Sequence, residues 1–196
     1  MSAGFHYDVN PAFEQEEICD VRTLHHKAGA YKLDTTGLAI GSRLPRFTPV
    51  QVDLTKRTCV VVKNAKVLED SEADATTVKI AKNSLVVEGM TLGTGSKGAV
   101  VKSIDKTNPD YDILTLAAAF GEKVKAGQVL FEASAAGGTK PKNTANFVIY
   151  ETTKIDDGIV LIALIMQAYE IHESKLVLPF SDADKAALTS RFQFED

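Results

Sequence analysis

Much of the chain alternates apolar and polar side chains with the two-residue period of a β-strand. The segment PVQVDLT at 49–55 places Val50, Val52 and Leu54 on one face, and TCVVVKNAKV at 58–67 is rich in β-branched residues. Both patterns are typical of strands, and the Gly and Pro residues between apolar runs mark turns. Residues 21–66 are therefore predicted to be β structure.

A second set of short strands is predicted in the middle of the chain. The stretches TTVKIAKN, LVVEGMTLG, GAVVKSID, YDILTLAAAF and GQVLFEA are separated by turns that contain Gly or Asn-Pro. Short strands with turn signals at this spacing are typical of a small barrel. The stretch GEKVKAGQVLFEA at 121–133 is then the turn and closing strand of that barrel.

The last third of the chain returns to strand character and ends in a helix. The run IVLIALIM at 159–166 is continuously apolar, which predicts a strand covered on both faces. In SDADKAALTSRF at 181–192, Ser181 is a good N-cap and Asp184 stands where it can return the capping bond. This segment is the one convincing helix in the sequence.

These elements predict a mainly β fold in three parts. Residues 21–66 and 141–196 form a β core that carries the short C-terminal helix. Residues 67–140 form an inserted small β-barrel-like domain, bounded by the Gly-rich and Pro-containing linker ASAAGGTKPKN. Residues 1–20 form an extended N-terminal arm, because the Asn-Pro dipeptide at 10–11 blocks a helix there.

Composition adds limits on the class of protein. Of 196 residues, 44% are hydrophobic but only 7% are aromatic, so the core is expected to be aliphatic. Cys19 and Cys59 form no CxxC pair, and we expect two buried, inert thiols. The start has no basic and apolar segments of a signal peptide, and eight apolar residues are too few to cross a bilayer. We expect synthesis in the cytoplasm and no membrane partner.

Charge is distributed unevenly along the chain. Residues 1–20 carry five acidic residues and no Lys or Arg, whereas residues 21–66 carry nine basic residues against two acidic ones. The basic residues are dispersed through strand-like sequence, without a basic helix or interleaved aromatic residues, which argues against nucleic acid as the partner. Contact between copies, or with an acidic protein, is the expected use of this asymmetry.

The sequence contains no complete motif for catalysis, for a metal or for a cofactor. GTGSKG at 93–98 has the spelling of a dinucleotide loop, but a strand follows it where the motif needs a helix, so a hairpin is predicted. His25 and His26 are neighbours on a strand and point to opposite faces. The lysines near GEKVKAGQVLFEA lack the neighbours of a biotinyl or lipoyl site. We expect a non-enzymatic protein with no cofactor and no metal.

Three stretches, taken in order, resemble bacteriophage head fiber and head decoration proteins, particularly those of Bacteroidales prophages. They are LPRFTPVQVDLTKRTCVVVKNAKVLED at 44–70, the segment 75–133 with IDKTNPDYDILT and KAGQVLF, and the ending at 159–195. Long head fibers carry a coiled-coil or repetitive shaft. No heptad run appears here, which favours a compact module bound to the capsid.

The resemblance implies a virion structural protein that binds the outer face of the assembled head, often as a trimer, and reinforces the capsid. The implied partner is the major capsid protein. We expect the arm residues Phe5, Tyr7 and Phe13 to dock on the capsid or on a neighbouring copy, with Arg43 and Arg46 steering the contact. The alternative is that both arginines are merely solvated around Pro45. A second alternative function is an adhesive module in which the inserted domain binds a host glycan.

Overall fold

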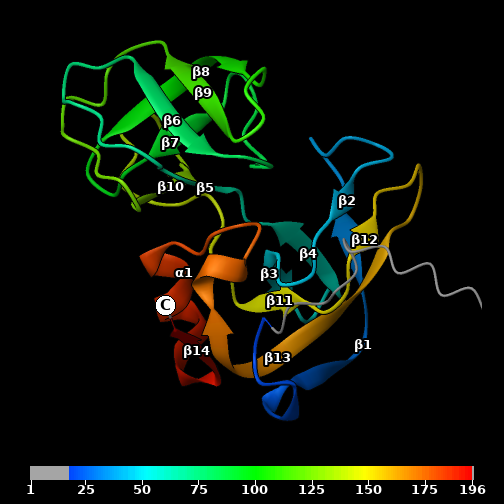
Figure 1. The fold of residues 1–196 in the computed structure, drawn as a ribbon. Coiled ribbons are helices and arrows are strands. Elements are labelled where there is room, and N and C mark those ends of the chain that lie inside the picture. The colour runs from blue at the N-terminus through cyan, green and yellow to red at the C-terminus, as the bar shows by residue number, and fades with distance from the viewer. Residues whose placement is uncertain (1–17, 196) are drawn as a thin grey trace, which may run out of the picture.

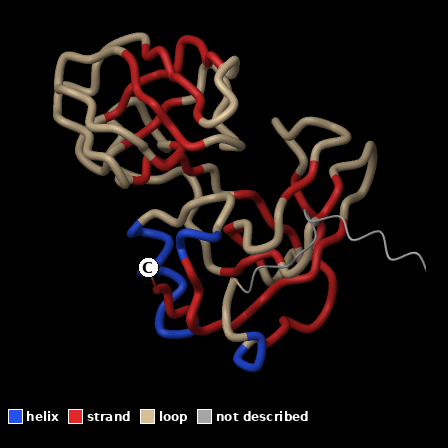
Figure 2. Tube along the Cα trace, viewed as in Figure 1, coloured by secondary structure: helices blue, strands red, loops and turns tan. Residues whose placement is uncertain are grey.

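The computed structural model describes residues 18–195, which form two β-rich bodies joined by short crossing segments (Figures 1 and 2). One body contains the beginning and the end of the described chain, and the other is built from the residues between them. The predictions of a mainly β fold and of a short C-terminal helix are confirmed.

The first body is organised around a six-stranded sheet in the order β1-β4-β3-β11-β13-β14. Its strands are β1 His25–Asp34, β3 Pro49–Asp53, β4 Thr58–Val61, β11 Phe147–Ile149, β13 Leu161–His172 and β14 Phe192–Glu195. The period-two segment predicted at 49–55 forms β3, where Val50 and Val52 are buried while Leu54, just beyond its end, is 48% exposed. The strand β13 is the longest and also pairs with β1, which bends the sheet back on itself.

A small two-stranded sheet extends this body at one end. The strands β2 Arg43–Leu44 and β12 Thr153–Lys154 pair antiparallel. The backbone ladder continues past them, because Gly41 N donates to Ile155 O at 2.7 Å and Ile155 N donates to Ser42 O at 2.8 Å. Loop 35–42, which precedes β2, and loop 155–160, which follows β12, project from the same end of the molecule (Figure 1).

The second body is a six-stranded sheet in the order β5-β10-β7-β8-β9-β6. Its strands are β5 Asn64–Lys66, β6 Thr77–Ala81, β7 Thr91–Gly93, β8 Gly98–Asp105, β9 Tyr111–Leu116 and β10 Val129–Glu132. They enclose a core of their own, dominated by aliphatic side chains such as Ile80, Leu92, Leu114 and Leu130. The sheets do not close into a clear barrel. The edge strands β5 and β6 share only one isolated bridge, between Val67 and Ile80.

The glycine-rich stretch at 93–98 is a hairpin between β7 and β8, as predicted. Glycines are required where this hairpin meets the linker at 133–143. A Cβ on Gly98 would lie 2.4 Å from Ala136 O, and one on Gly138 would lie 2.0 Å from Lys97 O. The linker at 133–143 thus packs its backbone directly on the hairpin, and only glycine leaves enough room.

The C-terminal segment covers one face of the first sheet. It contains the 3-10 turn η3 Glu173–Lys175, the helix α1 Asp182–Leu188, the 3-10 turn η4 Thr189–Arg191, and then β14. Ser181 caps α1 and forms a reciprocal capping box with Asp184, as the sequence predicted. The strand β14, parallel to β13, was not predicted.

Burial differs between the two ends of β13. Leu164 and Ile165 are buried on opposite faces, in two separate core clusters, as a doubly covered strand requires. Ile159 and Leu161 are 73% and 59% exposed, so the prediction of cover on both faces is wrong there. The reason is that Phe180, Leu188 and the cluster around α1 cover only the second half of β13.

Candidate functional site

The described residues present contact surfaces more clearly than any reactive centre. Among residues 18–195, no group of three His, Cys, Asp or Glu side chains is placed to hold a metal ion. No helix in that part of the chain is both long enough and apolar enough to cross a membrane. Burial raises the pKa of the Cys59 thiol to about 12, which keeps it protonated and unreactive. Cys19 is also buried.

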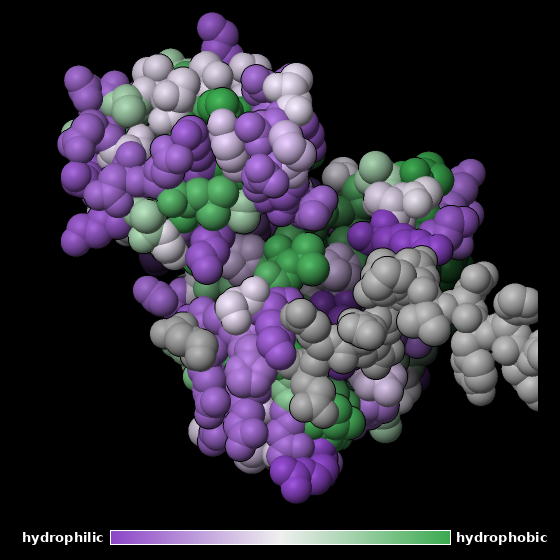
Figure 3. All heavy atoms as spheres, viewed as in Figure 1, coloured by the Kyte–Doolittle hydropathy of each residue, from purple (hydrophilic) through white to green (hydrophobic). Residues whose placement is uncertain are grey.

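The first candidate surface is the end of the first body formed by loops 35–42 and 155–160, here called the tip. Ile40 and Ile159, which are 68% and 73% exposed, are the two most exposed large apolar side chains among residues 18–195. The backbone pairing of Gly41 with Ile155 holds the two loops together. Apolar side chains gather over this end in the space-filling view (Figure 3). Exposed apolar side chains that gather into one patch are a feature of protein-binding surfaces.

The two predicted arginines lie next to the tip but in different environments. Arg43 is exposed in β2, opposite Lys154 of β12. Arg46 is half-buried, with its guanidinium 5.3 Å from the centre of the Phe47 ring. The Nε of Arg46 is buried and has no hydrogen-bond partner among the described residues. Arg43 is thus free to meet a partner, whereas Arg46 is partly committed to packing.

Phe5, Tyr7 and Phe13 lie outside the described residues. The end of the predicted arm is visible at Ile18–Asp20, which runs along β13. His172 N donates to Ile18 O at 2.9 Å, and Asp20 N donates to Tyr169 O at 3.2 Å. Hydrogen bonds from Arg22 lower the pKa of Asp20, which keeps this carboxylate charged. The point from which the arm departs is therefore fixed near the C-terminal end of β13.

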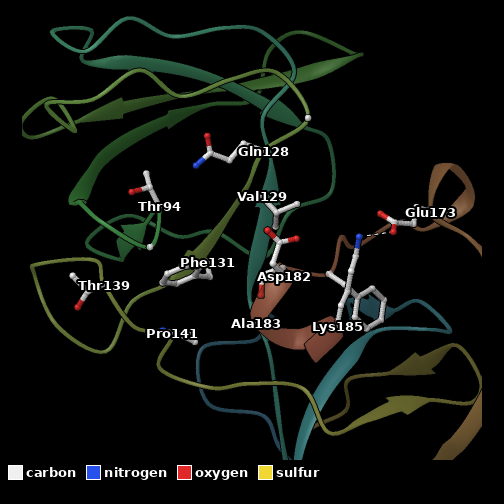
Figure 4. A pocket seen from close by; sticks show the side chains of 14 residues that line it. Thr94, Gln128, Val129, Phe131, Thr139, Pro141, Glu173, Asp182, Ala183 and Lys185 are labelled. Carbon is white, nitrogen blue, oxygen red and sulfur yellow. Dashed lines mark hydrogen bonds and ion pairs between the residues drawn. The ribbon is translucent and has the colours of Figure 1, made fainter. Parts of the chain in front are cut away.

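A cleft of about 420 Å³ separates the two bodies beside α1 (Figure 4). Thr94, Gln128, Val129 and Phe131 line it from the second body, and Asp182 and Lys185 line it from α1. Lys185 forms an ion pair with Glu173 across one side of the cleft. A second groove of about 450 Å³ shares Val129 and Phe180 with it and is more apolar, with Leu68 and Val177 partly exposed.

Beneath the cleft, a buried carboxylate ties the two bodies together. Asp184 is 0% exposed and accepts from Asn64 Nδ2 at 2.8 Å, Ala145 N at 2.8 Å, Ser181 N at 3.0 Å and Ser181 Oγ at 2.6 Å. Asn64 begins the second sheet, and Ala145 lies on the segment that returns to the first. The side chain of Asp184 therefore holds the two segments that connect the bodies, at Asn64 and at Ala145, and also caps its own helix.

A third surface is the outer face of the first sheet around the start of β13. Leu161 of β13 is in register with Lys32 of β1, and Lys32 is in register with Thr58 of β4. These three side chains point outward, because their neighbours Tyr31, Leu33 and Ile162 are buried. The sequence did not identify this surface, because a continuous apolar run is ordinarily a sign of burial.

The fold and these surfaces define a β-rich protein with exposed apolar and charged surface patches. Residues 1–193 match the family of the head fiber protein, and the chain belongs to this phage family. It is a phage structural protein associated with the virion. No curated protein and no solved structure matches the chain.

Proposed function

We propose that the protein binds the outer surface of the phage capsid and stabilises the head, as a trimer bound to the major capsid protein. The membership of the head fiber family over residues 1–193 supports a place on the head. The observation that carries the proposal is the tip, where Ile40 and Ile159 stand exposed beside Arg43. The compact two-body shape suits a module seated on the shell.

Burial of the apolar side chains of the tip would contribute to the free energy of binding. Complete burial of an aliphatic side chain of this size contributes about 1.5–3 kcal/mol. Two such side chains give a modest contact for one copy. Symmetric copies that engage neighbouring capsid subunits together gain avidity, which converts modest contacts into stable attachment. Attachment across subunit boundaries would also hold the subunits together.

Arg43 supplies the polar part of this contact. It is exposed and lies on the strand that leads directly from the tip. An exposed cation steers association with an acidic partner and makes its rate sensitive to salt. Arg46 contributes through the position of the loop, because its guanidinium packs on Phe47.

The test uses purified heads that lack the protein. Wild-type chain and the double variant Ile40→Asp/Ile159→Asp are mixed with these heads, and the bound fraction is measured by co-sedimentation. The matched control is Val87→Asp, which changes an apolar side chain of the second body that is 45% exposed. We expect the double variant to lose binding and the control to keep it.

A second measurement tests stabilisation separately. Heads with and without bound protein are heated, and DNA release is followed with a dye. Bound wild-type protein is expected to raise the temperature of release. Equal binding by the double variant would remove the tip from the proposal, and an unchanged release temperature would remove the stabilising role.

A further inference from the structure

The outer face of the first sheet continues into a groove at the edge of the second body. Beyond the row formed by Leu161, Lys32 and Thr58, the next outward pair is Asp34 of β1 with Val60 of β4. Val60 also lines a groove of about 290 Å³. Its other lining residues include the apolar Leu38 and Val61 and the charged Asp34, Lys63, Glu132 and Lys142. A partner segment would thus meet an exposed leucine and then a groove with an apolar wall.

This surface carries more positive than negative charge. Lys32, Arg57 and Lys63 have no ion-pair partner within 4 Å among residues 18–195. Arg57 lies next to Lys32, whose N donates to Arg57 O at 2.9 Å. Lys142 pairs with Glu132, so this pair adds no net charge. Asp53, which is in register with Thr58, pairs with Lys56 at 3.7 Å and also adds no net charge. Asp34 is then the remaining acid, and hydrogen bonds from Thr36, with a smaller contribution from Lys32 and Lys63, lower its pKa.

We propose that the N-terminal segment of a second copy of this chain docks on this surface. Residues 1–17 carry four acidic residues and no Lys or Arg, together with the aromatic residues Phe5, Tyr7 and Phe13. The acidic residues complement the unpaired cations, and the aromatic residues suit Leu161 and the apolar wall of the groove. The inference deepens the proposed function, on which it rests for its biological use, by naming the contact between copies.

The reach of Phe13 points to a second copy as its source. Ile18 is bonded to His172, at the opposite end of β13 from Leu161. The eleven steps between them span about 36 Å along a strand. Phe13 is five residues from Ile18 and reaches at most about 18 Å. In its own chain Phe13 therefore falls short of Leu161, whereas Tyr7 and Phe5, eleven and thirteen residues from Ile18, reach at most about 40 Å and 47 Å and are not limited in this way. Contact of Phe13 with Leu161 thus requires the segment of a neighbouring copy.

The direct test is a photo-cross-link from the full chain. Phe13 is replaced by benzoylphenylalanine, and chains of normal and heavy isotope composition are mixed before irradiation. Mass spectrometry then distinguishes links between copies from links within one copy. We expect mixed-isotope links to peptides containing Lys32, Thr58 or Leu161. Links confined to one chain, links to another surface or no links would each overturn the proposal.

Charge reversal tests the complementarity. The variant Lys32→Glu/Lys63→Glu is expected to lower the yield of mixed-isotope links about tenfold, because two attractive contacts become repulsive. The matched control is Lys102→Glu/Lys106→Glu, which reverses two exposed lysines in and just beyond β8. Adding Glu14→Lys/Glu16→Lys to the first variant should restore the yield. A yield equal to that of the control, or no restoration, would contradict the docking.

The same variants separate this inference from the capsid proposal. A single copy of Lys32→Glu/Lys63→Glu still has its tip and should bind heads, with reduced avidity. Ile40→Asp/Ile159→Asp should lose head binding and keep the mixed-isotope cross-links. If the cross-links fail while heads are still bound through the tip, only the contact between copies is refuted.

Discussion

The buried carboxylate of Asp184 gives the sharpest stability prediction. The substitution Asp184→Ala removes the acceptor of the Ala145 N–H and of the Ser181 N–H, which lie 2.8 Å and 3.0 Å from it. Both groups are in a region without solvent, since Ala145 is 0% and Ser181 4% exposed. The side chain of Asn64 keeps one partner, because its Nδ2 also donates to Pro179 O at 2.9 Å.

The size of the effect follows from those two orphaned donors. Each unsatisfied buried donor costs about 1–3 kcal/mol, and the loss of the capping box adds to this. Removal of the carboxylate also removes the cost of burying its charge, which offsets part of the loss. We therefore expect a decrease of about 3 kcal/mol in the free energy of unfolding. For a chain of this size, that lowers Tm by about 6–12 °C.

Urea denaturation and calorimetry measure this change, with Asp182→Ala as the matched control. Asp182 is the exposed first residue of the same helix, so its loss should cost only about 0.3–1 kcal/mol through the helix dipole. Hydrogen exchange should increase around Asn64 and Ala145 in Asp184→Ala alone. A loss below about 1 kcal/mol, or equal losses in the two variants, would refute the assignment of Asp184 as the link between the bodies.

Three further predictions concern local features. Gly138→Ala should lower the free energy of unfolding by more than about 2 kcal/mol, because the φ of Gly138 is +65° and the added Cβ would lie 2.0 Å from Lys97 O. The control Gly137→Ala has open space around the added Cβ and should be nearly neutral; urea denaturation measures both. Cys59 should not react with a thiol reagent at pH 8 until the protein is unfolded, since its thiol pKa is about 12; rapid labelling of the native chain would contradict this. Hydrogen bonds from Ser96 and Thr94 lower the pKa of Glu122, so it stabilises the fold above its unfolded pKa, and this contribution disappears as the pH falls through the lower folded value. Glu122→Gln should therefore lose less stability than the wild type between pH 7 and pH 3, and parallel pH profiles would show that the effect is absent.

Local signals in the sequence predicted several elements correctly. The capping pair Ser181 and Asp184 located the start of α1, because the signal needs only residues three apart. The glycine pattern at 93–98 was assigned to a hairpin from the strand that follows it. The alternation at 49–55 predicted the strand β3 and the shared buried face of Val50 and Val52, although Leu54 lies beyond the strand and is exposed. Each of these depends on neighbours in sequence, which is why a single sequence was sufficient.

Features that depend on distant partners could not be predicted in the same way. Ile159 and Leu161 belong to a continuous apolar run, and their exposure is decided by where the cluster around α1 ends. The strand β14 is four residues long and exists because β13 offers it an edge. Barrel closure depends on how two edge strands meet, and here they share one bridge. The surface around Lys32 requires the register of three strands, which no local pattern contains.

The two crossings between the bodies have a consequence for how such a protein could be altered. The chain enters the second body after Lys63 and leaves it at Glu132. These two points are adjacent, because Glu132 N donates to Lys63 O at 2.9 Å. The residues between them thus begin and end at one point. A short bridging peptide between Lys63 and Glu132 could replace them, with the loss of Asn64 and of its hydrogen bond to Asp184. The second body is therefore a position at which one inserted module could be exchanged for another, provided that the replacement again supplies a hydrogen-bond donor to Asp184.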